Sequence, residues 1–285
     1  MIELTTIPDL RRWVRGERAA GRRVALVPTM GYLHEGHLRL IDEGRRRADA
    51  VLLSIFVNPL QFGPNEDLAR YPRDLQRDRS LARARGVDAL FVPTQAMMYP
   101  PGSEVRVVPG PSADRWEGAA RPGHFAGVLT VVAKLFHLVE PDVACFGRKD
   151  IQQATLVRQM VRDLDWPLDI VVVPTVREAD GLALSSRNAY LDPADRRRAV
   201  VLSAALRAAH EAFRAGERQA AALLTAMRRT LAAEPGVMVE YLAVVEPRAL
   251  TPAETVDANT VVALAARLGR TRLIDNIILG DGLDG

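Results

Sequence analysis

Several residue types are scarce in this chain of 285 residues, and each scarcity excludes something. Cys145 is the only cysteine, so the chain forms no internal disulfide and no Cys-x-x-Cys metal site. No run of about 18 uncharged apolar residues occurs, so we expect no membrane-spanning helix. The first residues lack the basic region and apolar core of a secretory signal, and we expect a cytoplasmic protein.

Charge and aromatic content argue against a nucleic-acid-binding surface. Aromatic residues make up 5% of the chain, and the formal net charge is +3. A nucleic-acid site usually shows basic residues in a stripe interleaved with aromatics. The arginine runs 45–47 and 196–198 fall instead on predicted helix faces that we expect to be solvated. We therefore expect neither a nucleic acid nor a membrane as a partner.

The first two thirds of the chain alternate short apolar runs with helical patterns. The runs are rich in Val, Leu, Ile and Phe, as is typical of parallel strands covered on both faces. Repetition of strand and helix predicts an α/β fold with a doubly wound, Rossmann-like parallel sheet. The expected strands are 24–28, 51–57, 89–93, 143–147 and 169–176, and the expected helices are 36–49, 74–86, 125–139 and 151–164.

The pattern changes after about residue 176. Two alanine-rich helical patterns are followed by three strand-like runs, which together indicate a small α+β unit. The helices are expected near 193–215 and 217–234, and the strands at 237–246, 259–269 and 271–279. The sequence thus predicts a Rossmann-like domain over 1–176 and a smaller C-terminal α+β domain over 177–285.

The stretch 28-PTMGYLHEGHLRL-40 follows an expected strand and opens an expected helix. His34 and His37 lie three residues apart in the first helical turn, so their rings share one face. Gly36 leaves no side chain between them, so a flat group could approach the backbone. A helix N-terminus attracts anions, and two neutral imidazoles could donate hydrogen bonds to a phosphate that gains charge during reaction. The stretch therefore predicts a phosphoryl-transfer site.

Two other interpretations of this histidine pair stay open. One histidine could cap the helix while the other lies on the surface. The pair could also bind zinc, but it would need a third ligand. Its spacing also differs from the i, i+4 spacing of zinc metalloproteases.

Amide side chains follow a second expected strand, in the loop 58-NPLQFG-63. Ligands of doubly wound sheets bind at the carboxyl ends of the strands, which is where this loop is expected to lie. Asn58 and Gln61 can both donate and accept, which suits a substrate with hydroxyls and a carboxylate. The alternative is that these amides bond only to their own turn.

Two further loops carry groups suited to phosphate oxygens. In 147-GRKD-150, Gly147 lets a ligand approach the backbone, and Lys149 is one of two lysines in an arginine-rich chain. A compact ammonium suits phosphate oxygens as a point charge. The hydroxyls and guanidinium of 185-SSR-187 could bind a triphosphate, or they could be a helix cap beside a surface arginine.

Six stretches of the sequence, in this order, resemble the pantoate–β-alanine ligase family. They read VPTMGYLHEGH, SIFVNPLQFGPNEDL, YPRD, RPGHFAGVLTVVAKLF, FGRKDIQQ and DGLALSSRNAYL. The His-x-Gly-His part alone resembles the wider group of nucleotidyltransferases and class I aminoacyl-tRNA synthetases, which attack the α-phosphate of ATP. Six ordered blocks through about residue 195 are far more specific than that motif.

The resemblance implies a ligase that forms a C–N bond in pantothenate and coenzyme A biosynthesis. In that family the carboxylate of (R)-pantoate attacks the α-phosphate of ATP, which gives pantoyl adenylate and pyrophosphate. The amine of β-alanine then attacks the acyl adenylate and releases AMP. The resemblance also implies Mg²⁺ on the phosphates, a homodimer, and a C-terminal domain that closes over the nucleotide.

The same resemblance implies a role for each motif residue. His37 would be a proton donor and His34 a phosphate contact, while Lys149 would hold the α-phosphate or the pantoate carboxylate. The implied ATP-binding residues are Met30, Gly31, Tyr32, Leu33, His34, Glu35, Gly36, His37, Gly147, Arg148, Lys149, Asp150, Val176, Leu184, Ser185, Ser186 and Arg187. The implied residues for pantoate and β-alanine are Asn58, Gln61 and Gln153. Asp78 corresponds to an acidic position associated with Mg²⁺, which ATP phosphates would mainly hold.

The sequence departs from the family pattern within the 147–153 motif. Most relatives have an acidic residue where Arg148 stands and an aromatic residue where Ile151 stands. We expect Arg148 to point away from the site, because its neighbours in the motif are intact.

Four other polar residues have open or unassigned roles. His124 could cap its helix or reach the substrate. Arg121 could meet pyrophosphate or a carboxylate. Asp275 and Asn276, near the C-terminus, receive no role from the sequence.

Two rival functions are distinguishable from the ligase. An adenylyltransferase acting on a phosphorylated substrate would use the same histidines, but it would need a basic pocket where the neutral loop 58–63 lies. A non-enzymatic RNA-binding relative of the synthetases would be expected to lose His34, His37 or Lys149 and to gain a basic stripe. The sequence shows none of these losses.

Overall fold

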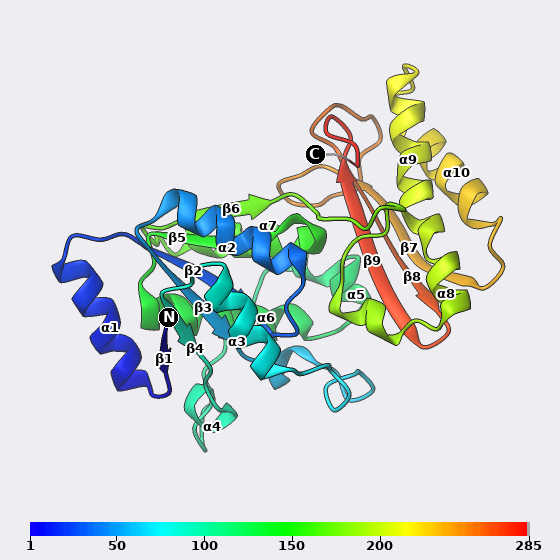
Figure 1. The fold of residues 1–285 in the computed structure, drawn as a ribbon. Coiled ribbons are helices and arrows are strands. Elements are labelled where there is room, and N and C mark those ends of the chain that lie inside the picture. Colours follow the sequence, from blue (N-terminus) through cyan, green and yellow to red (C-terminus); the bar gives the residue numbers. More distant parts are fainter. Residues whose placement is uncertain (284–285) are drawn as a thin grey trace. The chain divides into compact units, whose positions relative to one another are not determined.

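The computed structural model describes residues 1–283. The described chain contains a parallel sheet of six strands, in the order β1-β4-β3-β2-β5-β6, and an antiparallel sheet of three, in the order β7-β8-β9 (Figure 1). The chain forms two compact units. The first unit comprises Met1–Ala113, Arg121–Gly147 and Leu156–Val173, and the second comprises Asp114–Ala120, Arg148–Thr155 and the chain from Pro174 onward.

Every pair of neighbouring strands in the larger sheet is parallel. Its strands are β1 (Ile2–Leu4), β2 (Val24–Thr29), β3 (Ala50–Ile55), β4 (Ala89–Phe91), β5 (Val143–Gly147) and β6 (Asp169–Val173). The central strands are almost entirely buried and consist mainly of Val, Leu, Ile and Ala, as expected for a sheet covered on both faces. The predicted Rossmann-like α/β fold is confirmed.

Helices cover both faces of the parallel sheet. They are α1 (Ile7–Ala19), α2 (Glu35–Arg47), α3 (Leu75–Ala84), α6 (His124–Val139) and α7 (Ile151–Asp163), while the short helix α4 (Gln95–Met98) follows β4. Helix α2 packs Ile41 into the same apolar cluster as Cys145 of β5. The next residue of β5, Phe146, faces the opposite side and meets Phe136 of α6 edge to face, with ring centroids 6.4 Å apart. Among the described residues, no helix is long and apolar enough to cross a membrane.

The order of the parallel strands reverses between β2 and β5. From β2 the chain continues to β3 and β4 in one direction, whereas β5 and β6 lie in the other. Ligands of doubly wound sheets bind at such a switch point, beyond the carboxyl ends of the strands. Strand β2 ends at Thr29 and β5 ends at Gly147. The segments after these residues are therefore the expected ligand-binding loops.

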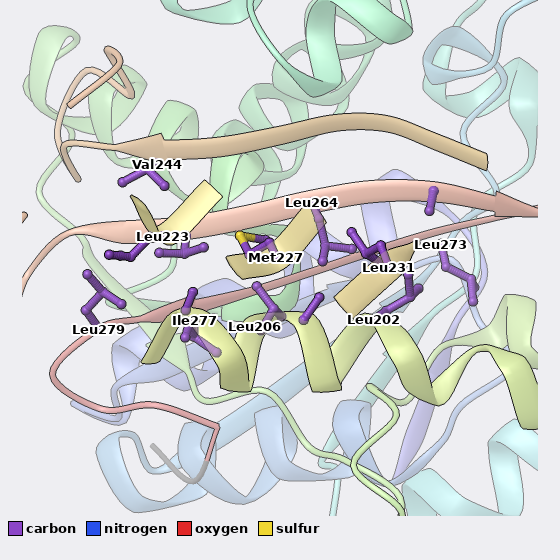
Figure 2. Packing of buried hydrophobic residues seen from close by; sticks show 14 of the residues in the cluster. Leu202, Leu206, Leu223, Met227, Leu231, Val244, Leu264, Leu273, Ile277 and Leu279 are labelled. Carbon is purple, nitrogen blue, oxygen red and sulfur yellow. The ribbon is translucent and has the colours of Figure 1, made fainter. Parts of the chain in front are cut away.

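Helices α9 and α10 cover one face of the antiparallel sheet in the second unit. The strands are β7 (Val237–Val245), β8 (Val261–Leu268) and β9 (Thr271–Ile278), and the helices of the unit include α5 (Glu117–Ala120), α8 (Pro193–Arg198), α9 (Val200–Arg214) and α10 (Ala220–Leu231). Figure 2 shows Leu206 of α9 and Met227 of α10 packed with Leu264 and Ile277 of the sheet. The helix predicted over 193–215 is divided into α8 and α9 at Ala199.

The other face of this sheet is covered by two segments that come early in the chain. Trp116 and Ile151 pack with Tyr241 and the sheet. The short 3₁₀ helices of the described chain are η1 (Pro59–Gln61), η2 (Pro111–Asp114), η3 (Arg148–Asp150) and η4 (Ser186–Tyr190). The C-terminal domain predicted over 177–285 does not include residues 114–120 and 148–155, which belong to the second unit. The predicted domain boundaries stay a prediction.

Candidate active site

Strand β2 leads through a tight turn to the N-terminus of α2. Gly31 has a φ of +81°, and a Cβ there would lie 2.9 Å from Ile55 and 3.0 Å from Asp78, so the turn requires glycine. Tyr32 also adopts the left-handed region, with a φ of 51°. A non-glycine residue in this region costs roughly 1–3 kcal/mol, and such strain is concentrated at functional sites.

Helix α3 holds this strained turn. The two carboxylate oxygens of Asp78 accept hydrogen bonds from the backbone N–H groups of Tyr32 (2.8 Å) and Leu33 (2.7 Å). Arg77 donates from Nη1 to the carbonyl oxygen of Leu33 (2.8 Å). Burial raises the pKa of the Asp78 carboxyl, although the bonds from Leu33 and Tyr32 act to lower it. Asp78 and Arg77 therefore fix the backbone that enters the histidine motif.

The two histidines lie together at the start of α2. His34 is the N-cap residue, and its ring centroid lies 4.1 Å from that of His37, so the predicted shared face is confirmed. The Nδ1 atom of His37 accepts the backbone N–H of His34 (3.3 Å), which assigns the proton of the neutral ring to Nε2. A Cβ at Gly36 would lie 2.9 Å from the His34 ring. The His34 ring therefore lies against Gly36, and a larger residue at this position would displace it.

A buried network surrounds Asn58, just beyond strand β3. Its Nδ2 donates to Oε1 of Gln61 (3.0 Å) and to the carbonyl oxygen of Gly127 (3.1 Å). Its Oδ1 accepts from the hydroxyl of Tyr99 (2.8 Å), and burial raises the pKa of Tyr99 to about 12. The hydroxyl therefore stays a donor at neutral pH. Asn58 is 1% exposed, and this arrangement uses its amide to orient Gln61.

The backbone of Gln61 is fixed from a second side by residues at the start of α6. Its carbonyl oxygen accepts from Nδ1 of His124 (2.8 Å) and from Nη2 of Arg121 (3.1 Å). Arg121 is also paired with Glu66 (2.6 Å). Burial raises the pKa of Glu66, but the hydrogen bond and charge of Arg121 bring it below its usual value. The Gln61 side chain meanwhile contacts Sδ of Met30 (3.3 Å), so these two predicted site residues are adjacent.

The second unit carries Arg148, Lys149 and Asp150 of the predicted lysine motif, which form η3 directly before α7. The Nζ atom of Lys149 lies 3.9 Å from the carboxylate of Asp150. The guanidinium of Arg148 pairs with Asp281 (2.5 Å) and is therefore directed to the C-terminal turn. Asn276 donates from Nδ2 to the backbone carbonyl oxygens of both Arg148 (3.0 Å) and Lys149 (2.8 Å).

The remaining predicted nucleotide-binding residues of this unit lie on a short hairpin and the helix that follows it. The backbone N–H of Leu184 donates to the carbonyl oxygen of Val176 (2.9 Å), so these two residues are paired. Ser185 caps η4 by accepting from the N–H of Arg187 (3.2 Å), which is the alternative role that the sequence left open for it. Gln153 lies on α7 and is partly exposed.

The surroundings of Asp78 bear on its predicted metal role. Within residues 1–283, no group of three or more His, Cys, Asp or Glu side chains is arranged to hold a metal ion. Both oxygens of Asp78 bind backbone N–H groups instead. These side chains do not fit a metal site built by the protein alone, and a magnesium role for Asp78 stays a prediction.

Comparison with known proteins decides the family. The family model for pantoate–β-alanine ligase matches residues 3–278. The chain belongs to the pantoate–β-alanine ligase family. Among curated members of this family, the pantothenate synthetase of Moorella thermoacetica is 52% identical over 276 residues, which are 97% of this chain and 98% of that protein.

Solved structures of pantoate–β-alanine ligases share the fold over the full length. Pantothenate synthetase from Thermus thermophilus is 51% identical, with a TM-score of 0.94 over 98% of this chain and 99% of that chain. The pantoate–β-alanine ligase from Francisella tularensis, crystallised with beta-gamma ATP and β-alanine, is 34% identical, with a TM-score of 0.80 over 100% of both chains. The resemblance inferred from the six sequence blocks is confirmed.

Three residues of the candidate site were missed by sequence reasoning. Arg77 precedes Asp78 directly, and its position at the start of α3 was the only local signal for its contact with Leu33. Tyr99 reaches Asn58 from 41 residues away, and Glu66 reaches Arg121 from 55 residues away. No periodicity or motif marks contacts at such separations.

Proposed function

We propose that the protein condenses (R)-pantoate with β-alanine to give pantothenate, AMP and pyrophosphate through a pantoyl-adenylate intermediate. As a member of its family the chain is an ATP-dependent ligase that forms a C–N bond. The observation that carries the residue assignments is the pair of imidazoles, 4.1 Å apart, at the N-terminus of α2. This helix begins directly after the strand at the switch point, where a nucleotide is expected.

In the first step, His34 and His37 stabilise the charge that develops on the α-phosphate. A carboxylate oxygen of pantoate forms a bond to the α-phosphorus, and the bond to the bridging oxygen of pyrophosphate breaks. Phosphoryl transfer depends mainly on positioning and electrostatics, so we assign the histidines as hydrogen-bond donors. The bond from the His34 N–H to Nδ1 of His37 supports this role, because it leaves Nε2 of the neutral ring as the donor nitrogen.

Pantoate is assigned to the surroundings of Gln61. The side chain of Gln61 accepts a hydrogen bond from Asn58 and lies against Met30, which belongs to the turn before the histidine pair (residues 30–33, the histidine turn). Its backbone is held by His124 and Arg121. A neutral amide fixed from both sides suits a substrate with hydroxyls and one carboxylate, and the nearby guanidinium of Arg121 is already paired with Glu66. This favours the ligase over an adenylyltransferase for phosphorylated substrates.

In the second step, the neutral amine of β-alanine attacks the acyl carbon of pantoyl adenylate. The bond between that carbon and the oxygen attached to phosphorus breaks, AMP leaves, and the amine loses a proton to solvent. The nucleotide-binding roles that the family resemblance implies for residues of the second unit are part of this proposal. Lys149, Ser186 and Arg187 would bind phosphate oxygens, Asp150 the ribose hydroxyls, and Gln153 a pantoate hydroxyl, while Val176 and Leu184 would contact adenine or ribose.

Magnesium is proposed to arrive with ATP, because phosphate oxygens and water are its usual ligands at such sites. Its chemical contribution when bound is neutralisation of phosphate charge. A homodimer and a cytoplasmic location are further predictions from the family and the sequence.

An omission assay tests the proposed function. Purified protein is mixed with ATP, Mg²⁺, pantoate and β-alanine, each substrate is left out in turn, and AMP, ADP and pyrophosphate are measured. We expect continuous formation of AMP and pyrophosphate only in the complete mixture. When β-alanine is absent, pyrophosphate should form in an amount stoichiometric with enzyme, while the AMP group stays in pantoyl adenylate. Formation of ADP, or of an end product that keeps the AMP group in the complete mixture, would contradict the proposal.

A further inference from the structure

The segment that carries Lys149 is held by the C-terminal strand of its own unit. Asn276 on β9 donates two hydrogen bonds, to the carbonyl oxygens of Arg148 and Lys149. Arg148 in turn pairs through its side chain with Asp281, which follows β9. Arg148 is thereby fixed through both its backbone and its side chain, and Lys149 is fixed through its backbone.

The neighbouring residue of β9 holds a second segment. Successive side chains of a strand point to opposite faces, so Asp275 lies on the face of the sheet opposite to Asn276. Asp275 binds the guanidinium of Arg177 through both oxygens, at 2.6 and 3.0 Å. Arg177 directly follows Val176, which the proposed function places beside the nucleotide. Adjacent residues of one strand thus anchor both segments of the second unit that carry proposed nucleotide contacts.

The hydrogen bonding of Asn276 is difficult to explain by stability alone. Asn276 is 3% exposed, and within the described chain its side-chain oxygen Oδ1 is buried with no hydrogen-bond partner. An unpaired buried acceptor is destabilising. The opposite orientation of the amide would place Oδ1 against two carbonyl oxygens, so the two N–H donors determine its position. A buried side chain that leaves one acceptor unpaired is expected where the position of the backbone it binds is needed for function.

We propose that Asn276 is a positioning residue for Lys149. By binding two consecutive carbonyl groups, its amide fixes the backbone from which the ammonium extends, and so presents Lys149 to a phosphate oxygen in one orientation. This inference rests on the proposed function, which gives Lys149 the phosphate contact. It assigns a task to a residue that touches no substrate.

A double-mutant cycle tests the inference. Asn276→Ala, Lys149→Ala and the double variant are compared with the wild-type protein, and kcat and KM for ATP and for pantoate are measured by AMP release. Asn259→Ala, the same change at an exposed position, is the matched control and should behave as wild type. Asn276→Leu keeps the branched shape of the side chain while removing both donors, and it replaces Asn276→Ala if that variant does not fold.

The expected result is a loss of about tenfold in kcat/KM for ATP in Asn276→Ala, the factor that corresponds to breaking one or two ordinary hydrogen bonds. The KM for pantoate should be unchanged. In the Lys149→Ala background, the Asn276 substitution should lower activity no further. If the two losses multiply, Asn276 acts independently of Lys149 and the inference is wrong while the proposed function stands. If Lys149→Ala is fully active, the role proposed for Lys149 fails, and the inference fails with it.

Discussion

Two segments are fixed by hydrogen bonds of opposite direction: the histidine turn of the first unit (residues 30–33) and the lysine segment of the second unit (residues 148–150). In the turn, the carboxylate of Asp78 accepts hydrogen bonds from two consecutive backbone N–H groups. In the lysine segment, the amide of Asn276 donates to two consecutive backbone carbonyl groups. A carboxylate only accepts, and an amide NH₂ donates twice, so each side chain matches the backbone groups that its segment presents.

The type of side chain at each place therefore matches the backbone groups that it binds: a carboxylate binds N–H groups, and an amide NH₂ binds carbonyl groups. Bonds between an ionised carboxylate and N–H groups are roughly twice as strong as bonds between neutral groups. The turn that contains the left-handed residues Gly31 and Tyr32 is fixed by the stronger hydrogen bonds to a carboxylate. The lysine segment is fixed by hydrogen bonds from a neutral amide. The second unit adds its charge elsewhere, in the buried pair of Arg177 and Asp275.

The largest effect is expected from breaking that buried pair. Arg177→Ala leaves Asp275, whose side chain is 2% exposed, without its cation, and we expect a loss of about 3–5 kcal/mol in the free energy of unfolding. Urea unfolding measures this loss. Arg162→Ala, which removes an arginine from an exposed pair, is the control and should cost less than about 1 kcal/mol.

The double variant Arg177→Met/Asp275→Leu sharpens this prediction. Replacing both charges with apolar side chains removes the unpaired charge, so stability should recover most of the loss. A double variant as unstable as Arg177→Ala would show that the other contacts of Arg177, to the carbonyl oxygens of Gly181 and Asn276, matter more than the charge pair.

The next largest effect is expected at the reacting phosphate. His37→Ala should lower kcat by about 10²–10³-fold, the loss found when one transition-state donor is removed. Steady-state AMP release measures it, with the exposed His137 as the site of a matched His→Ala control. Turnover equal to wild type would exclude His37 from the catalytic step.

Asp78→Asn tests the hold on the histidine turn. The amide can accept only one of the two backbone N–H bonds, and its NH₂ would face the other N–H group. We expect kcat/KM for ATP to fall by about tenfold to a hundredfold, since one charge-assisted bond contributes roughly 1.5–3 kcal/mol. Asp163→Asn, at an exposed position, should leave activity unchanged. A normal Asp78→Asn enzyme would mean that the turn keeps its shape without the carboxylate.

A smaller effect is expected from Gln61→Ala. It should raise the KM for pantoate by about tenfold, as expected for the loss of roughly 1.4 kcal/mol of binding energy, and leave the KM for ATP unchanged. Initial rates at varied concentrations of each substrate measure both constants. An equal loss for both substrates would place the pantoate pocket elsewhere.

The smallest effect concerns the acid dependence of the Glu66–Arg121 pair. The pKa of Glu66 is lowered in the folded protein, so its stabilising contribution is present above the unfolded pKa of about 4.3 and is lost as pH falls through the lower folded value. Glu66→Gln should therefore be less stable than wild type at pH 7, and the difference should shrink below about pH 4. Melting temperatures at several pH values measure it, and a constant difference would contradict the assigned pairing.

Local patterns in the sequence predicted the central strands, most helices and the histidine pair, because continuous apolar runs and helical spacing are properties of short segments. Strand β1 escaped prediction because it has three residues and pairs only with β4. Helix α1 was also missed, although Thr6 caps it by accepting from the N–H of Asp9. The capping threonine is thus a local signal for α1, but the prediction of helices rested on apolar spacing and did not use it.

The roles of the holding residues could not be predicted from local patterns. Asp78 reaches Tyr32 across 46 residues, and Asn276 reaches the Arg148 carbonyl across 128 residues. Such contacts depend on the tertiary fold. The contact between Gly36 and the His34 ring is likewise visible only in the structure, and the expected approach of a ligand to this backbone stays a prediction.

The most direct test of the central claim, that pantoate attacks the α-phosphate held at the N-terminus of α2, is the transfer of oxygen from the substrate carboxylate. Pantoate labelled with ¹⁸O in its carboxylate is converted with ATP, Mg²⁺ and β-alanine, and the products are analysed by mass spectrometry. The account predicts one ¹⁸O atom in each AMP formed from labelled pantoate and none in pyrophosphate. Unlabelled AMP, or label in inorganic phosphate together with ADP, would contradict it.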